Sequence, residues 1–171
     1  MKTKLKTITM KDIQEYGPCY SPLKYAGQGW SGTVLTILNN SNVPTKDRLW
    51  VVLRNDLLSD RILRLFAVSC ARKALTLVKN PDPRSVNACN VAERFANGKA
   101  TAKELEAARS DAAAAADAAA DAAAAYAAAD AAAAAAAYAA AAAADAADAG
   151  EKARREQIKQ LIKLIKEEYD A

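Results

Sequence analysis

The sequence contains no histidine, and this absence removes several kinds of chemistry. Without an imidazole there is no Ser-His-Asp triad, no Cys-His dyad and no imidazole metal ligand. The cysteines Cys19, Cys70 and Cys89 are an odd number without the spacing of a metal site, and we interpret them as reduced thiols. We therefore expect a protein that is not an enzyme, with no catalytic residue, no metal and no cofactor.

Large apolar side chains are also scarce. The hydrophobic fraction is 52%, but 44 of the 171 residues are alanine, so the larger side chains suffice for one modest core. Residues 1–11 are polar and basic and lack the apolar stretch of a secretory signal. Six aspartates interrupt the one long run of low polarity, and a central Asp costs about 2.5–3.5 kcal/mol on membrane insertion. We expect a cytoplasmic protein without a transmembrane span and with no membrane as its partner.

Charge is unevenly distributed along the chain. Residues 1–109 carry 18 basic and 9 acidic side chains, whereas residues 110–149 carry six aspartates and no base. Residues 150–171 are nearly balanced, with six basic and five acidic side chains. A basic body thus precedes an acidic segment, and either the two meet or each faces a separate partner.

The pattern predicts a mostly all-α fold in three segments. Residues 1–100 form a basic helical body, and within it residues 17–32 form an irregular loop rich in Gly, Pro and aromatic residues. Fixed aromatic side chains on a loop either pack over the core or provide anchors for a partner, and both interpretations remain open for Tyr20, Tyr25 and Trp30.

Capping signals place the helices of this body. Thr45 is expected to cap a helix that contains Leu49 and Val52, although a buried strand has a similar pattern. A helix over about 60–78 carries the stripe Ile62, Phe66, Cys70 and Ala74. Asp82 and Pro83 predict the start of a further helix that ends at Asn97 and Gly98.

The second segment, residues 101–149, is expected to be a long Ala/Asp-rich helix. Thr101 and Glu104 match a capping box, and neither Gly nor Pro follows before Gly150. Residues 111–149 consist of 31 Ala, six Asp and two Tyr. One straight helix is the favoured interpretation, and an Ala-packed hairpin is the alternative.

The third segment, residues 150–171, is predicted to be an amphipathic helix after a bend that Gly150 permits. Its apolar stripe packs back on the first segment, or mediates self-association, or lies on a membrane surface or in a partner's groove. The candidate oligomerisation residues are Ile158, Leu161, Ile162, Ile165 and Tyr169.

Several stretches of the chain resemble a known group of proteins. They are Thr7–Ile13, Gly17–Tyr20, Gly29–Thr33, Asp47–Arg54, Leu63–Ala67, Asp82–Ser85, Ala92–Gly98 and Thr101–Leu105, which runs into the Ala tract. Together they resemble small, Ala-rich proteins of phage and bacterial genomes, and the last stretches are similar to an immunity protein family associated with bacterial toxin systems. The resemblance implies binding to a toxin or host defence factor and supplies no catalytic residue. Relatives place Trp or Arg in the tract, where this chain has Asp and Tyr.

We therefore expect a non-enzymatic protein that binds another protein and acts by occlusion, as an immunity-type or phage counter-defence inhibitor. A long acidic helix can cover a basic surface such as a nuclease cleft. The candidate partner-binding residues are Tyr20, Trp30, Asp111, Asp117, Asp121, Tyr126, Asp130 and Tyr138. Two alternatives remain, a nucleic-acid-binding accessory protein that uses the basic body and a self-assembling structural protein.

Overall fold

The computed structural model describes residues 4–115 and 135–169, and the side chains of 4–115 and 150–169. The fold is mostly α-helical with a two-stranded sheet, which confirms the expected fold class. The chain divides into two compact units. Unit 1 comprises Met1–Phe66 and Ala153–Ala171, and unit 2 comprises Ala67–Lys152. This division differs from the three segments expected from the sequence, because the C-terminal residues belong to the same unit as the N-terminal ones.

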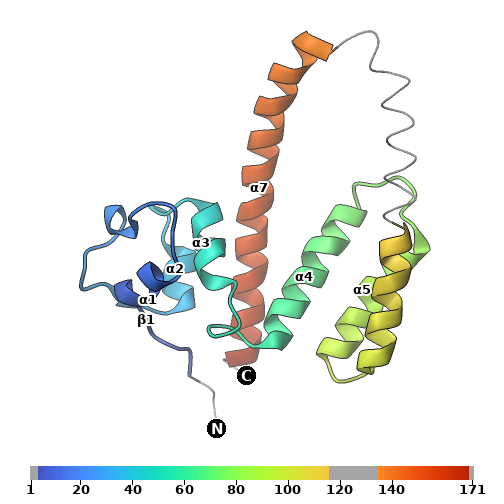
Figure 1. Ribbon diagram of the computed structural model, residues 1–171, viewed down its shortest axis with the longest axis horizontal. Helices are drawn as coiled ribbons and strands as arrows, with labels where there is room; N and C mark the ends of the chain where they lie inside the picture. The colour runs from blue at the N-terminus through green and yellow to red at the C-terminus, as the bar shows by residue number, and fades with distance from the viewer. Residues whose placement is uncertain (1–3, 116–134, 170–171) are drawn as a thin grey trace. The chain divides into compact units, whose positions relative to one another are not determined.

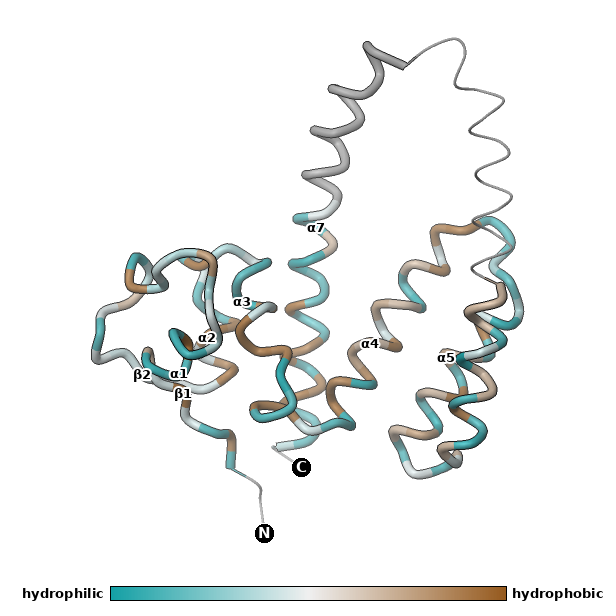
Figure 2. Tube along the Cα trace, viewed as in Figure 1, coloured by the Kyte–Doolittle hydropathy of each residue, from teal (hydrophilic) through white to brown (hydrophobic). Residues whose placement is uncertain are grey.

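Unit 1 is built mostly from short elements, and its strands and α-helices are labelled in Figures 1 and 2. They are β1 (Ile8–Thr9), α1 (Met10–Glu15), η1 (Pro22–Lys24), β2 (Ser31–Gly32), α2 (Val34–Asn39), α3 (Thr45–Val52), the start of α4 (Asp60–Leu75) and the end of α7 (Ala135–Tyr169). Strands β1 and β2 are antiparallel, with Ile8 opposite Gly32 and Thr9 opposite Ser31. The sheet therefore joins the two ends of the segment that contains the 17–32 loop.

Two threonine capping boxes start the first helices of unit 1. The Thr9 backbone N–H donates to Asp12 Oδ2 at 2.7 Å, and the Asp12 N–H donates back to the Thr9 hydroxyl at 3.3 Å. Thr33 and Thr36 form the equivalent pair at the start of α2. Each box satisfies N–H groups that a helix start leaves without an intrahelical partner.

Helix α3 confirms the helical interpretation of residues around Leu49 and corrects its cap. Pro44, not Thr45, is the N-cap, and its carbonyl accepts from Asp47 N at 3.0 Å and from Arg48 N at 3.1 Å. The backbone of Pro44 is extended, with φ −53° and ψ 144°, so the helix begins at the next residue. Thr45 is therefore the first helical residue, and it is buried.

Helix α4 begins as expected but ends at Leu75 rather than near Val78. The Ile62 N–H donates to Ser59 Oγ at 3.2 Å at its start. Along the predicted stripe, Ile62 and Phe66 are buried, but Cys70 is half-buried and Ala74 is exposed. Burial at the far end of α4 therefore does not follow the sequence stripe.

Unit 2 shows the capping residues that the sequence predicts. Asp82 caps α5 (Pro83–Ala96) by accepting from Arg84 N at 2.8 Å, and Gly98 adopts φ +69° just after the C-cap. The Thr101 N–H donates to Glu104 Oε2 at 2.7 Å, and the Glu104 N–H donates to Thr101 Oγ1 at 3.2 Å. Residues 102–115 are helical after this box.

Helix α7 is one helix through Gly150, so that glycine lies inside an element and not at its boundary. In its C-terminal part Ile158, Leu161 and Ile165 are at most 5% exposed, and hydrophobic and hydrophilic positions alternate there (Figure 2). Glu168 accepts from Ser59 Oγ at 2.6 Å and pairs with Arg61 at 3.2 Å, which ties this end of α7 to the start of α4 within unit 1. Of the candidate oligomerisation residues, these three are buried within unit 1, whereas Ile162 and Tyr169 are half-buried.

The choice between a straight helix and a hairpin depends on residues 116–134, which lie outside the described part of the chain. Among the candidate binding residues, Asp117, Asp121, Tyr126 and Asp130 also lie outside it, as does the side chain of Tyr138. Within the described residues, no helix is both long and apolar enough to cross a membrane.

Candidate functional site: an aromatic pocket in unit 1

The loop over residues 17–32 is held at its C-terminal end by the sheet. Beside the strand pairing, the Met10 N–H donates to the Trp30 carbonyl at 3.0 Å. A Cβ at Gly32 would lie 2.9 Å from the Trp30 ring and 2.9 Å from Thr36 Cβ. Glycine at this position therefore lets the indole of Trp30 pass close to the start of α2.

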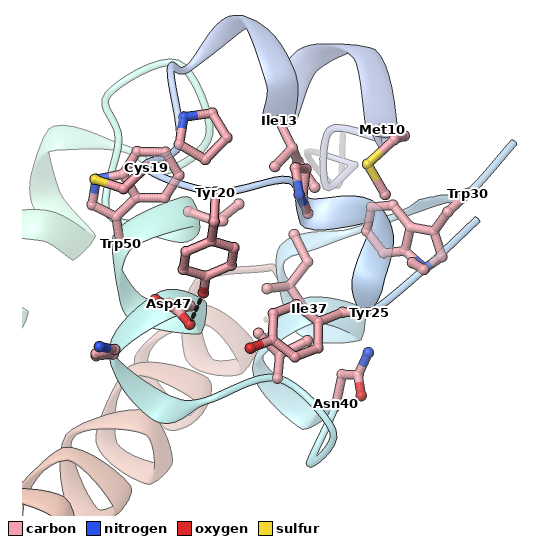
Figure 3. A pocket seen from close by; sticks show the side chains of 16 residues that line it. Met10, Ile13, Cys19, Tyr20, Tyr25, Trp30, Ile37, Asn40, Asp47 and Trp50 are labelled. Atoms are coloured by element: carbon pink, nitrogen blue, oxygen red, sulfur yellow. Dashed lines mark hydrogen bonds between the residues drawn. The ribbon is translucent and has the colours of Figure 1, made fainter. Parts of the chain in front are cut away.

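This loop, α1, α2 and α3 surround a cavity of about 440 Å³, which we call the aromatic pocket. Its floor consists of core residues, and its walls carry most of the aromatic side chains of the loop and of α3 (Figure 3). The floor residues are Met10, Ile13, Ile37 and Val51, and the aromatic residues are Tyr20, Tyr25, Trp30 and Trp50. The volume lies within the range of about 300–1,000 Å³ that is typical of ligand pockets.

Tyr20 is held in the pocket by Asp47. Its hydroxyl donates to Asp47 Oδ2, and its ring meets that of Tyr25 edge to face, with centroids 6.1 Å apart at 72°. Desolvation and the hydrogen bond to Asp47 raise the pKa of Tyr20 above its ordinary value. The phenol therefore stays protonated near neutral pH and serves as a donor.

Cations of the chain itself lie against the aromatic rings of this region. Lys24 Nζ is 4.9 Å from the ring centroid of Tyr20 and 4.8 Å from that of Tyr25. The guanidinium of Arg54 lies 4.7 Å from the ring centroid of Trp50 and 4.0 Å from that of Tyr16. Such contacts place Lys24 and Arg54 against the rings that shape the pocket.

A hydrogen-bonded cluster supports the Arg54 stack. The Tyr16 hydroxyl donates to Asp56 Oδ2 at 2.9 Å, and Lys6 Nζ donates to the same oxygen at 3.2 Å. Desolvation and this hydrogen bond raise the pKa of Tyr16 to about 12. Although desolvation acts to raise it, the donors Tyr16 and Lys6 lower the pKa of Asp56 overall.

The structure brings together only part of the predicted set of binding residues. Tyr20 and Trp30 line the same pocket, but Asp111 is an exposed residue of unit 2. Sequence reasoning missed Trp50 and Asp47 as members of the site. The available signal for Trp50 was weak, because a large aromatic beside Leu49 and Val51 has the pattern of a core residue. In the structure Trp50 is 41% exposed.

The pocket is suited to binding. The Tyr20 hydroxyl donates a hydrogen bond to Asp47. The exposed Cys19 lies among apolar and aromatic side chains (Figure 3). Within the described residues, no group of three or more Cys, Asp or Glu side chains could hold a metal ion. The arrangement provides apolar and aromatic surface for a guest, with polar atoms at Asn40, Lys46 and Asp47.

Comparison with protein-family models, curated proteins and solved structures finds no match to this chain.

Proposed function

We propose that this chain is a non-enzymatic protein that binds another protein through the aromatic pocket. The observation that carries the proposal is the cavity of about 440 Å³ with four aromatic side chains around an apolar floor. Aromatic residues dominate the energetics of protein interfaces, and a preformed hollow is where an anchor side chain of a partner becomes desolvated.

The biological setting we propose is inhibition by occlusion, as in immunity proteins or phage counter-defence proteins. The resemblance of the sequence to Ala-rich immunity-type proteins supports this setting. Such an inhibitor needs only to cover a functional surface of its target, and binding surface alone is sufficient for that task. The exposed position of Asp111 is compatible with a contact from the acidic segment.

Nucleic-acid binding is the second candidate, because the basic charge of unit 1 favours it. Unit 1 carries 15 basic and 9 acidic residues, a net charge of +6, and Trp50 offers an exposed ring. Exposed aromatics beside basic residues bind single strands by stacking and phosphate contact. However, two arginines of α4 are engaged by carboxylates, Arg61 by Glu168 and Arg72 by Glu93, which lessens their availability to phosphates.

The deciding experiment is affinity capture of the tagged full-length chain from bacterial lysate, with and without nuclease, read by mass spectrometry. We expect a stoichiometric protein partner that resists nuclease and is lost with Trp50→Ala and with Tyr20→Ala. The matched control is Leu77→Ala, which removes an apolar side chain that is 81% exposed in unit 2. A partner that survives both pocket variants contradicts the proposal, and capture that disappears with nuclease favours the second candidate.

A further inference from the structure

The rim of the aromatic pocket carries more positive than negative charge. Lys46 lines the pocket, and Lys24 lies against the rings of Tyr20 and Tyr25. Both lysines are exposed, and among the described residues neither forms an ion pair. Asp47 is the one acidic residue that lines the pocket, and it already accepts a hydrogen bond from Tyr20.

The position of Lys24 is fixed more firmly than exposure alone indicates. Its ammonium group lies 4.9 Å and 4.8 Å from two ring centroids, so two cation–π contacts hold the side chain against the rings of Tyr20 and Tyr25. An exposed lysine normally loses much side-chain entropy when it binds a carboxylate. At Lys24 the cation–π contacts already order the side chain in the free protein, so less side-chain entropy is lost on binding.

The interior of the pocket favours an aromatic guest. Trp30 and Tyr25 provide ring surface, and the thioether of Met10 belongs to the floor. Aromatic rings pack edge to face or offset against such surfaces, and a methionine sulfur adds a favourable contact with a ring. A cationic guest is disfavoured, because Lys24 lies over the rings of Tyr20 and Tyr25, Arg54 lies over the ring of Trp50, and Lys46 lines the pocket.

We infer that the occupant of the aromatic pocket is an acidic segment of the protein partner, whose aromatic side chain enters the cavity while flanking carboxylates meet Lys24 and Lys46. This inference rests on the proposed function and adds the chemistry of the partner. The net charge of +6 on unit 1 acts in the same direction, since it attracts an acidic segment during encounter.

The test uses the full-length chain and a labelled, end-blocked peptide in which phenylalanine is flanked by two acidic residues on each side. Binding is measured by fluorescence anisotropy at low salt. We expect binding to weaken about tenfold or more when alanine replaces the phenylalanine. We expect no measurable binding when lysines replace the acidic residues.

Variants of the rim test the charge contribution. Lys24→Gln and Lys46→Gln are each expected to weaken the acidic peptide roughly two- to fivefold, with a smaller effect at high salt. The control is Lys159→Gln, an exposed lysine of unit 1 that pairs with Glu156 at 2.7 Å on the surface of α7. It should leave the affinity unchanged, and circular dichroism should show that all three variants keep the helical fold.

The following outcomes overturn the inference or the proposed function on which it rests. Equal binding of the lysine-flanked peptide removes the charge argument, and equal effects of the rim and control variants do the same. Binding of free phenylacetate as tightly as the peptide identifies a small-molecule pocket instead. If the acidic peptide fails to bind while the captured partner still depends on Trp50, the partner chemistry is wrong and the proposed function stands. If the peptide binds but the captured partner is indifferent to Trp50, the proposed function is wrong.

Discussion

The two units of the chain differ in the size of their buried side chains. Unit 1 has large side chains that are at most 1% exposed, among them Leu38, Leu161 and Ile165. In unit 2 the buried side chains that the structure describes are smaller, Val68, Cys89, Val91, Ala108 and Ala115. Both units add capping boxes and surface ion pairs to their cores, with two boxes in unit 1 and one in unit 2 among the described residues.

The charge of the two units differs as well. Unit 1 has a surplus of six positive charges, whereas unit 2 carries 9 basic and 11 acidic residues, a net charge of −2. In unit 2, Arg72 pairs with Glu93 at 2.6 Å and Arg94 pairs with Glu104 at 2.7 Å. Among the described residues both units form surface ion pairs, and Lys24 and Lys46 beside the aromatic pocket of unit 1 form none.

The largest expected effect is the loss of a core side chain of unit 1. Leu161→Ala should lower the free energy of unfolding by about 2–5 kcal/mol, because Leu161 is fully buried and its removal leaves a cavity. Urea unfolding followed by circular dichroism measures this change. Leu77→Ala in unit 2 is the control and should change the free energy of unfolding by less than about 0.5 kcal/mol. Similar losses in both variants would mean that the burial of Leu161 in unit 1 does not stabilise the fold.

The next effect concerns a helix cap of unit 2. Thr101→Ala removes the hydroxyl that accepts from Glu104 N, and we expect a loss of about 1 kcal/mol in the stability of helix 102–115. Hydrogen exchange of the amides in its first turn should become faster. Thr101→Ser retains the hydroxyl and should behave like the parent chain. Equal exchange rates in the Ala and Ser variants would mean that the cap does not limit this helix.

A smaller effect is expected from the surface ion pairs of unit 2. Glu93→Gln removes the partner of Arg72, and the cost should stay below about 1 kcal/mol, because both side chains are more than 40% exposed. The loss should shrink in molar salt. Glu106→Gln is the comparison variant, since its pair with Arg109 is longer, at 3.5 Å, and more exposed. A larger cost for Glu106→Gln than for Glu93→Gln would contradict this ranking.

The smallest expected effect concerns the ionisation of Tyr16, and it is observed only at high pH. Because the folded pKa of Tyr16 is raised to about 12 from an ordinary 10.0, its contribution to stability is fully present below pH 10 and is lost as the pH rises through the folded value. Titration of tyrosinate absorbance should show a late step, and Tyr16→Phe should reduce that step by one tyrosine. A titration in which all tyrosines ionise together near pH 10 would rule out the burial and hydrogen bond that shift Tyr16.

Local structure was largely predictable from the sequence. The Asp82 cap, the Asn97–Gly98 ending and the Thr101–Glu104 box were all expected and are all present, because each depends on residues within one helical turn. The cap of α3 was predicted at Thr45 and lies at Pro44, whose ψ of 144° keeps it outside the helix. The family resemblance and the proposed inhibitor role remain predictions.

Sequence patterns could not predict the aromatic pocket. Its walls combine Tyr20 with Trp50 and Asp47, which are 27 or more residues away along the chain. No periodicity links a loop residue to a helix residue at that distance. The exposure of Trp50 was equally hidden, because its neighbours Leu49 and Val51 are buried.

Composition and contacts within one helical turn were enough to predict the helical class, the caps of α5 and of helix 102–115, and the uneven charge. The burial of Ile158, Leu161 and Ile165 in unit 1, and the cavity that the loop aromatics surround, depend on the tertiary structure. The physical reason is that burial depends on which segments meet. An amphipathic stripe indicates that the helix packs against an apolar surface. The sequence pattern alone does not identify that surface.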